Sequence, residues 1–307
     1  MSTRTTLAPL RIGRSKEKRW AALFLSPWVI GFVVLTVGPM IASLYFSFTR
    51  YSIIDNPVWL GLDNYVKLFT QDPKFYSALG ITFGYSFLAI PLGLVLGFLL
   101  AYMLNLKIPG TAFWRTIFYM PSVISGVVVA ILWRGLFDAK FGFINWTLSL
   151  LGIQGPEWLL SPEWALIALV LISLWGVGGG MIIYLAGLQA IPTSLYEAAE
   201  IDGCSRWQHL RKITLPMMSP IIFYNLVIGI ISCFQYFTEA WVLTRGGPAE
   251  ATQFYNIYIY KTAFSYLNMG YASSMAWVLF FIVLALTAVV FKSSSLWVYY
   301  EGEVKKS

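Results

Sequence analysis

Long apolar runs dominate this chain, and they constrain its fold more than any other feature. A helix needs about 20 residues to cross a hydrocarbon core of ~30 Å. About six runs reach that length, at roughly 20–48, 79–104, 116–134, 164–189, 219–243 and 271–292. With 58% hydrophobic and 11% charged residues, a water-soluble globule could not bury this surface. The sequence therefore predicts an all-α integral membrane protein with about six transmembrane helices.

One membrane domain over residues 20–292 accounts for most of the chain. A basic N-terminal segment (1–19) precedes it and a short tail (293–307) follows. The first apolar run is too long for the apolar region of a signal peptide, and no small-residue cleavage site closes it. We therefore expect it to remain as the first span.

Basic residues gather in the loops that would share one side of the membrane. They are Arg4, Arg11, Arg14, Lys16, Lys18, Arg19, Lys107, Arg115, Arg206, Arg211, Lys212, Lys305 and Lys306. The remaining loops are balanced or acidic, with Asp55, Asp63, Asp72, Asp138, Glu157 and Glu163. The positive-inside rule places both termini and the 190–218 loop in the cytoplasm. This asymmetry explains the net charge of +7 without nucleic-acid binding.

Several spans contain residues that disturb a helix. Pro27 and Pro39 predict a kink or break in the first span. Gly93 and Gly97, four residues apart, predict close helix packing in the second. The glycine-rich run 176–180 predicts a fourth span that either unwinds to line a cavity or packs tightly against a neighbour.

The residues that catalysis or nucleotide binding would need are missing. No G-x-x-x-x-G-K-[ST] sequence occurs, so this chain is not expected to hold ATP phosphates. His209 is the single histidine and lies in a polar loop, where we expect it in solvent or on a docking surface. Glu239 is the one acid within an apolar run, whereas ion-coupled carriers place several ionisable groups there. No catalytic, cofactor or metal site is expected, and a secondary carrier or a membrane-embedded enzyme is disfavoured.

The polar loop at 190–218 predicts a helix–turn–helix between the fourth and fifth spans. Ser194 and Glu197 are spaced as in a capping box, and Gly203 permits a left-handed turn before a second helix that runs to Pro216. Such a motif, presenting polar and small residues, suits the groove of a separate soluble domain. The alternative is a loop that only caps the two spans.

The sequence of this loop resembles the coupling loop of ABC importer permeases. It has Glu-Ala-Ala at 197–199, then Gly203 four residues later, then I-x-L-P at 213–216. Further stretches resemble permeases of carbohydrate-uptake systems of the maltose and oligosaccharide type, in order along nearly the whole chain. They lie at 26–51, 59–69, 185–203, 234–248 and 270–272.

The resemblance implies a maltose-importer-type permease fold of six helices in the bacterial cytoplasmic (inner) membrane. This chain would be one of two non-identical permeases that enclose a central cavity. Two ATPase subunits would bind ATP and Mg²⁺, and an extracytoplasmic binding protein would deliver the sugar. The residues expected to couple the ATPase are Glu197, Ala198, Ala199, Asp202, Gly203, Leu215 and Pro216. Cys204 stands where the family more often has alanine, a change that is not expected to alter docking.

Polar residues in the fifth run predict a substrate path. Ser232, Gln235, Tyr236 and Glu239 share one face of a continuous helix. That face could line a water-filled cavity or bond a neighbouring helix, and Glu239 could instead be interfacial. The resemblance implies further sugar contacts near Trp175. The candidate path is Trp175, Gly176, Gly179, Ser232, Gln235, Tyr236, Glu239, Tyr119 and Ser122.

The chemistry of this path favours a neutral ligand. Aromatic faces stack on sugar rings, and neutral amides and hydroxyls bond sugar hydroxyls. No Lys or Arg lies well inside a span, which favours a mono- or oligosaccharide or a polyol over glycerol-3-phosphate, the main alternative. The partner permease could still supply the charge that an anion needs. Thr238 stands where relatives often have Asp, so no family role is carried over to it.

Overall fold

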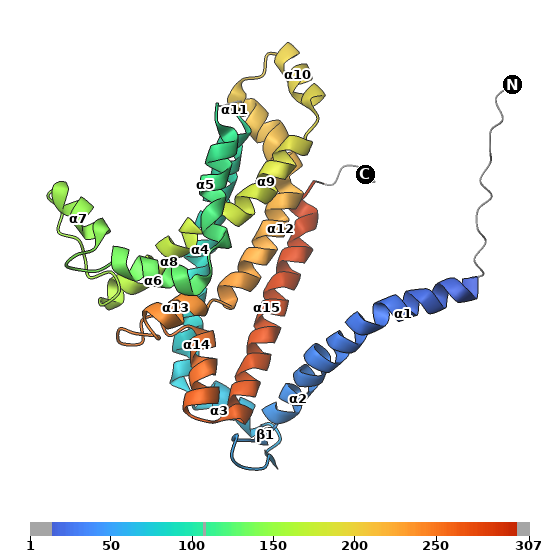
Figure 1. Ribbon diagram of the computed structural model, residues 1–307, viewed down its shortest axis with the longest axis vertical. Coiled ribbons are helices and arrows are strands. Elements are labelled where there is room, and N and C mark those ends of the chain that lie inside the picture. Colours follow the sequence, from blue (N-terminus) through green and yellow to red (C-terminus); the bar gives the residue numbers. More distant parts are fainter. Residues whose placement is uncertain (1–13, 107–108, 300–307) are drawn as a thin grey trace.

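The computed structural model describes residues 14–106 and 109–299, apart from the side chains of 14–18 (Figure 1). Strands β1 (Thr49–Arg50) and β2 (Val58–Trp59) pair antiparallel. The helices and the π-helical turns (η) are α1 (Arg14–Phe32), η1 (Val33–Val37), α2 (Gly38–Ser47), α3 (Asp63–Thr70), α4 (Pro73–Asn105), α5 (Thr111–Val123), α6 (Gly126–Leu136), α7 (Phe143–Leu150), α8 (Pro162–Trp175), α9 (Gly178–Ala190), α10 (Thr193–Ile201), α11 (Arg206–His209), η2 (Leu210–Thr214), α12 (Leu215–Phe234), α13 (Thr238–Leu243), α14 (Tyr255–Tyr260), η3 (Lys261–Ser265) and α15 (Met269–Trp297). The predicted all-α class is confirmed. The expectations for residues 1–13, Lys107 and the tail from 300 onward lie outside the described residues.

Four helical segments are long and apolar enough to cross a membrane, and two bent helix pairs raise the number to six. The four are Arg19–Ser47, Pro73–Asn105, Arg206–Leu243 and Met269–Trp297; the pairs are Thr111–Val123 with Gly126–Leu136, and Pro162–Trp175 with Gly178–Ala190. Each overlaps one predicted run. The sequence also indicated a kink in the first span and an irregular fourth span, but not the breaks in the third and fifth.

The kink predicted in the first span is a π-helical turn. Pro39 has no N–H to continue the helical ladder, and just before it the N–H of Gly38 donates to the carbonyl oxygen of Val33, one residue further back than in an α-helix. Pro27 lies inside α1. The entry to the fifth span repeats this arrangement, with η2 placed before Pro216.

The third predicted span, 116–134, is sharply bent rather than straight. α5 and α6 meet at 102° because Ile124 and Ser125, directly after the end of α5 at Val123, adopt extended backbone angles. Ser125 is the N-cap of α6, so it does not share a helical face with Tyr119 and Ser122. The fourth span bends by 44° at 176–177, within its glycine-rich run.

The fifth span also breaks, which contradicts the continuous polar face predicted at 232–239. α12 ends at Phe234, residues 235–237 leave the helix, and α13 begins at Thr238. Phe237 has φ −145° and ψ −57°, which no helix accommodates. The spacing i, i+3, i+4, i+7 therefore does not apply beyond Phe234.

Helix α4 is central and packs against α8, α9 and α12, while α15 packs against α2 and α12. Gly178 lies directly against the backbone of α5 at Phe118, so the glycine-rich run does pack tightly against a neighbour. Helix α1 leans away from the bundle in Figure 1. Within Arg19–Ser47, an apolar stretch of 18 residues has no residue buried by the described chain.

Asp72 joins three helices, α4, α14 and α15, at the end of the bundle opposite α10. Its carboxylate caps α4 by accepting from the N–H groups of Lys74 and Phe75. The same carboxylate accepts the hydroxyls of Tyr258 in α14 and Tyr271 in α15, both at 2.6 Å. Burial and the Asp72 carboxylate raise the pKa of Tyr258 far above its usual range, so this hydroxyl stays a donor. Nearby, Lys74 pairs with Glu250.

Candidate functional site

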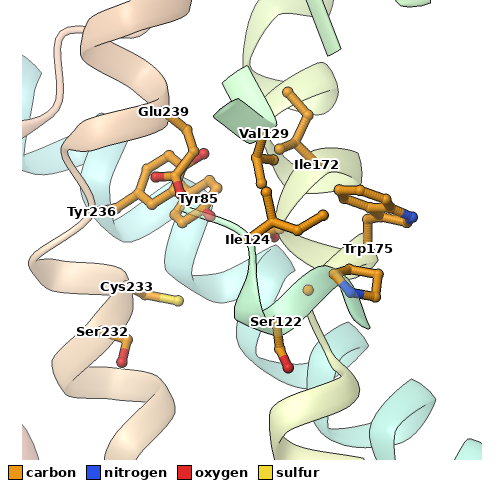
Figure 2. Close-up of a pocket in the computed structure, with 13 residues that line it drawn as sticks. Tyr85, Ser122, Ile124, Val129, Ile172, Trp175, Ser232, Cys233, Tyr236 and Glu239 are labelled. Carbon is orange, nitrogen blue, oxygen red and sulfur yellow. The ribbon is translucent and has the colours of Figure 1, made fainter. Parts of the chain in front are cut away.

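A cavity of about 340 Å³, here the first cavity, lies between α4, the α5–α6 bend, α8 and the α12–α13 break (Figure 2). Its lining residues are Tyr85, Pro121, Ser122, Ile124, Val129, Ile172, Ser173, Trp175, Gly176, Ser232, Cys233, Tyr236 and Glu239. Three of its walls are thus places where a helix bends or ends. The breaks expose backbone and short side chains that a straight helix would pack against its neighbours.

Aromatic rings form two sides of the first cavity. Tyr236 stacks on Tyr85 with ring centroids 4.7 Å apart and planes inclined by 16°. The hydroxyl of Tyr236 is buried and has no hydrogen-bond partner within the described chain. Trp175 is on the facing wall, held edge-on by Trp133 at 5.9 Å (Figure 2). A buried hydroxyl without a partner in an aromatic cavity is available to a ligand or a water molecule.

Glu239 places a carboxylate at the edge of this cavity. It lies in the first turn of α13, against Gly126 in the first turn of α6. Free backbone N–H groups at the start of a helix favour a nearby anion. Arg134, near the other end of α6, donates to the carbonyls of Val242 and Leu243 and so caps α13. These contacts hold the two short helices side by side.

The 190–218 loop is a helical hairpin at the end of the bundle opposite α3 and β1 (Figure 1). The predicted left-handed turn is present, with Gly203 at φ +74°. The capping box predicted at Ser194 and Glu197 is wrong, because α10 begins at Thr193 with no side-chain cap. A capping box forms instead at α11, where Ser205 and Gln208 bond each other's backbone N–H groups.

Two contacts hold the two halves of the hairpin together. The hydroxyls of Tyr196 in α10 and Thr214 in η2 are 3.0 Å apart. His209, expected in solvent or on a docking surface, is half-buried, and its ring lies 5.9 Å from that of Tyr196. The outer face of the hairpin is nevertheless apolar in part, since Ile201 is 88% and Trp207 66% exposed. An ordered hairpin with exposed apolar residues at its tip is typical of a docking element.

The comparison with known protein families decides the identity. Residues 89–299 match the family described as "Binding-protein-dependent transport system inner membrane component". The chain belongs to this family. It is therefore a multi-pass membrane permease.

Similar proteins extend this agreement over almost the whole chain. The "Probable ABC transporter permease protein YesP" of Bacillus subtilis (strain 168) is 47% identical over 284 residues, covering 91% of this permease and 92% of that protein. The "Trehalose/maltose transport system permease protein MalF" of Thermococcus litoralis is 32% identical over 90% of this permease and 94% of that protein. A chain of a bacterial ABC transporter involved in the import of the acidic polysaccharide alginate superposes with a TM-score of 0.82 at 28% identity. The superposition covers 91% of this permease and 96% of that chain. These matches confirm the resemblance and the fold inferred from the sequence.

The structure brings six of the nine predicted path residues together in the permease. Those that line the first cavity are Trp175, Gly176, Ser122, Ser232, Tyr236 and Glu239. Gln235 is exposed at the end of α12, and Tyr119 is 40% exposed; neither lines the cavity. Gly179 does not line it either, and lies instead close to Ser122 of α5.

The predicted coupling residues lie on or beside the hairpin of the permease. Glu197, Ala198 and Asp202 are exposed, whereas Ala199 is buried. Leu215 and Pro216 begin α12, where the hairpin joins the fifth span.

Some lining residues of the first cavity were not predicted from the sequence. Tyr85, Ser173 and Cys233 face it, yet each is a single tyrosine, serine or cysteine in an apolar run. Such residues are common where helices pack together, so only their position in the fold distinguishes these cavity-lining residues from packing residues. Among the described residues, no three His, Cys, Asp or Glu side chains come together as a metal site.

Proposed function

We propose that this permease forms, with a second homologous permease, the path for ATP-driven uptake of a neutral sugar delivered by an extracytoplasmic binding protein. Relatives named for trehalose/maltose, starch degradation products and multiple sugars support the substrate class. The related alginate transporter was solved in complex with a pentasaccharide-bound periplasmic protein, which supports the delivery step.

The first cavity is the observation that carries this proposal. An indole and a pair of stacked phenols offer faces for the C–H side of a sugar ring, and the hydroxyls of Ser122, Ser232 and Tyr236 can bond sugar hydroxyls. Its volume of about 340 Å³ is within the range of ~300–1,000 Å³ typical of ligand pockets. Trp175, Tyr236 and Glu239 are the residues to which we assign the main contacts.

The hairpin is the proposed docking site for the energy source. Glu197, Gly203 and the exposed Ile201 would lie in a groove of an ATPase subunit, which would bind ATP and Mg²⁺. Two such subunits would serve the two permeases. The hairpin and both termini would then be cytoplasmic, as the basic residues predict, in the inner membrane of a bacterium.

The residues that line the cavity disfavour an anionic substrate such as glycerol-3-phosphate. Glu239 would repel a phosphate or carboxylate, and no Lys or Arg lines the first cavity. An ion-coupled carrier is also disfavoured, since Glu239 is the one acidic residue on its walls.

Uptake by the reconstituted assembly tests the proposal. Proteoliposomes containing this permease, its partner permease and the ATPase would be given the binding protein, ATP and a labelled sugar. We expect accumulation of a neutral oligosaccharide from a panel of maltose, maltotriose and trehalose, and no accumulation without ATP. Uptake confined to uronate oligosaccharides or sugar phosphates would overturn the substrate class.

A matched pair of variants links the uptake to the first cavity. Trp175→Ala removes an aromatic face from the cavity and should lower apparent sugar affinity about fivefold, equivalent to ~1 kcal/mol. Trp146→Ala makes the same change on α7, where Trp146 is 56% exposed and lines no part of this cavity, and should leave affinity unchanged.

A further inference from the structure

A second cavity adjoins the first on the side of the hairpin. Its volume is about 280 Å³, and it lies between α4, α9 and α12. Ser173, Gly176, Ser232 and Cys233 line both cavities, so the two meet at the α8–α9 bend. The residues that line only the second are Ala89, Ile90, Gly93, Leu94, Leu174, Val177, Gly180, Tyr184, Asn225, Ile228 and Gly229.

Tyr184 brings a buried hydroxyl to the second cavity without a partner for it. The side chain is 1% exposed, and its oxygen has no hydrogen bond within the described chain. The ring is held firmly, edge-on to Phe98 at 5.8 Å and against Gly97 of α4. A phenylalanine would make these packing contacts equally well. The hydroxyl therefore does not stabilise the fold, and burying it without a hydrogen-bond partner is unfavourable.

Asn225 brings a second polar group to the same cavity from α12. Its Nδ2 donates to the carbonyl of Ile221 at 3.0 Å, one turn earlier. That bond leaves its Oδ1 as an acceptor, which lies beside Gly180 of α9. Gly93, on the facing wall, has no atom within 4 Å of where a side chain would begin. The cavity thus has open space at Gly93 and two polar groups whose hydrogen-bonding capacity the described chain leaves partly unused.

The second cavity carries no charge. No Lys, Arg, Asp, Glu or His is among its lining residues. Its polar groups are a phenol, an amide, two serine hydroxyls and the thiol of Cys233, and the remaining wall is aliphatic or glycine. Such a surface matches a neutral ligand that carries hydroxyl groups and has an apolar side.

We propose that the second cavity is an inner binding site for a hydroxyl-bearing unit of the transported ligand, with Tyr184 and Asn225 as its polar contacts. This inference rests on the proposed function, because it assumes that the first cavity takes up the ligand. Asn225 and Ser232 are seven residues apart on α12. Asn225, in the inner site, therefore lies about 10 Å nearer the hairpin than Ser232, which lines both cavities. A ligand unit leaving the first cavity passes the α8–α9 bend and reaches it. A longer oligosaccharide occupies both cavities at once.

Removing single polar atoms separates this role from a packing role. Tyr184→Phe keeps the ring and deletes the hydroxyl that lacks a partner. If the residue only packs, stability and uptake stay the same or improve. We expect instead that uptake of the neutral sugar identified in the panel above weakens about two- to tenfold in apparent affinity, with normal assembly. Asn225→Leu should do the same. Tyr224→Phe, on the exposed face of α12, is the matched control and should match the wild type.

Protection of cysteines locates the ligand directly and distinguishes the two proposals. In a Cys204→Ala variant, the remaining described cysteine is Cys233, whose labelling reports on the junction of the two cavities. A second variant adds Cys233→Ser and Asn225→Cys, so that labelling reports on the inner site instead. A neutral thiol reagent should label each in the full assembly, and the same sugar should slow both reactions. Protection at Cys233 but none at position 225, with unchanged uptake by Tyr184→Phe, would overturn the inner site and leave the proposed function intact. Protection at neither position, with no ATP-driven sugar uptake, would overturn the proposed function itself.

Discussion

Single residues decide where the helices of this permease can meet. The clearest case is Gly178, where any side chain would overlap the carbonyl group of Phe118 in α5. Backbone atoms cannot rotate away as a side chain can, so the overlap would force the two helices apart.

We therefore predict that Gly178→Ala destabilises the permease by ~1–3 kcal/mol. Gly80→Ala is the matched control, because a side chain at Gly80 in α4 meets no atom within 4 Å. That change should be neutral or stabilise the protein by up to ~1 kcal/mol. The measurement is the midpoint of heat-induced aggregation in detergent. Equal midpoints for the two variants would show that α5 and α9 separate easily.

Gly203 is the second residue whose identity matters, for a different reason. It has φ +74° and open space around it, so a substitution there acts on the backbone alone. Gly203→Val should strain the turn by ~1–2 kcal/mol and displace α10. We expect normal membrane insertion and loss of ATP-driven uptake. Gly203→Asn should keep most of the activity, because asparagine tolerates a left-handed conformation. Normal uptake in the valine variant would contradict a coupling role.

At this scale the sequence predicted residues where their chemistry was unusual for their surroundings or where the family resemblance indicated them. Glu239 was found because an acid in a span is rare, and Trp175 because the resemblance implied sugar contacts near it. Tyr85 and Tyr184 were missed because a lone tyrosine in an apolar run usually packs. Asn225 was the available signal for the second cavity, since an amide within a span is uncommon.

Among the elements, the apolar runs were found, but the breaks in the third and fifth of them were not. The 102° bend between α5 and α6 depends on two residues with extended backbone angles, Ile124 and Ser125, neither of which resists a helix strongly. The break at 235–237 contains no Gly or Pro at all. Tertiary contacts stabilise both the bend and the break, because α6 packs against α13 and Arg134 of α6 caps α13. Helical periodicity cannot reveal such contacts, which is why Gln235 was wrongly placed on one face with Tyr236.

The hairpin is the element whose attachment can be tested most sharply. Tyr196→Phe removes the hydroxyl that pairs with Thr214 and leaves the ring against His209. Losing this bond should weaken the attachment of α10 by ~1 kcal/mol. We expect less stimulation of ATPase activity by sugar-loaded binding protein in the reconstituted assembly. Tyr45→Phe, on the exposed surface of α2, is the control. Unchanged stimulation by Tyr196→Phe would mean that the hairpin is held by other contacts.

For the whole molecule, the sequence predicted the class, the number of spans and the family, because each depends on hydropathy and motifs spread over the entire chain. The cavities could not be predicted, since they form where segments distant in sequence converge. Tyr85 and Glu239, which share the first cavity, are more than 150 positions apart along the chain.

We predict that the permease purifies with a second, non-identical permease and two copies of an ATPase. Its sequence lacks a nucleotide-binding loop, and the apolar stretch within Arg19–Ser47 is uncovered in the described chain. Mild solubilisation from cells that express the complete transport system, followed by mass measurement of the intact assembly, would show the composition. Sugar accumulation in liposomes by this polypeptide alone, without ATP, would contradict the prediction.

The packing of α2 against α15 has a consequence for biosynthesis. Of the spans described above, the one that contains α2 leaves the ribosome first and the one that contains α15 leaves it last. The N–H of Gly270, at the start of α15, donates to the carbonyl of Tyr51 just after β1, so the earliest and the latest of these spans meet at one point. Until the final span is inserted, the first has no partner there and must wait in lipid or with an insertion chaperone. Chains truncated before α15 should therefore be degraded rapidly, even though most of their spans are complete.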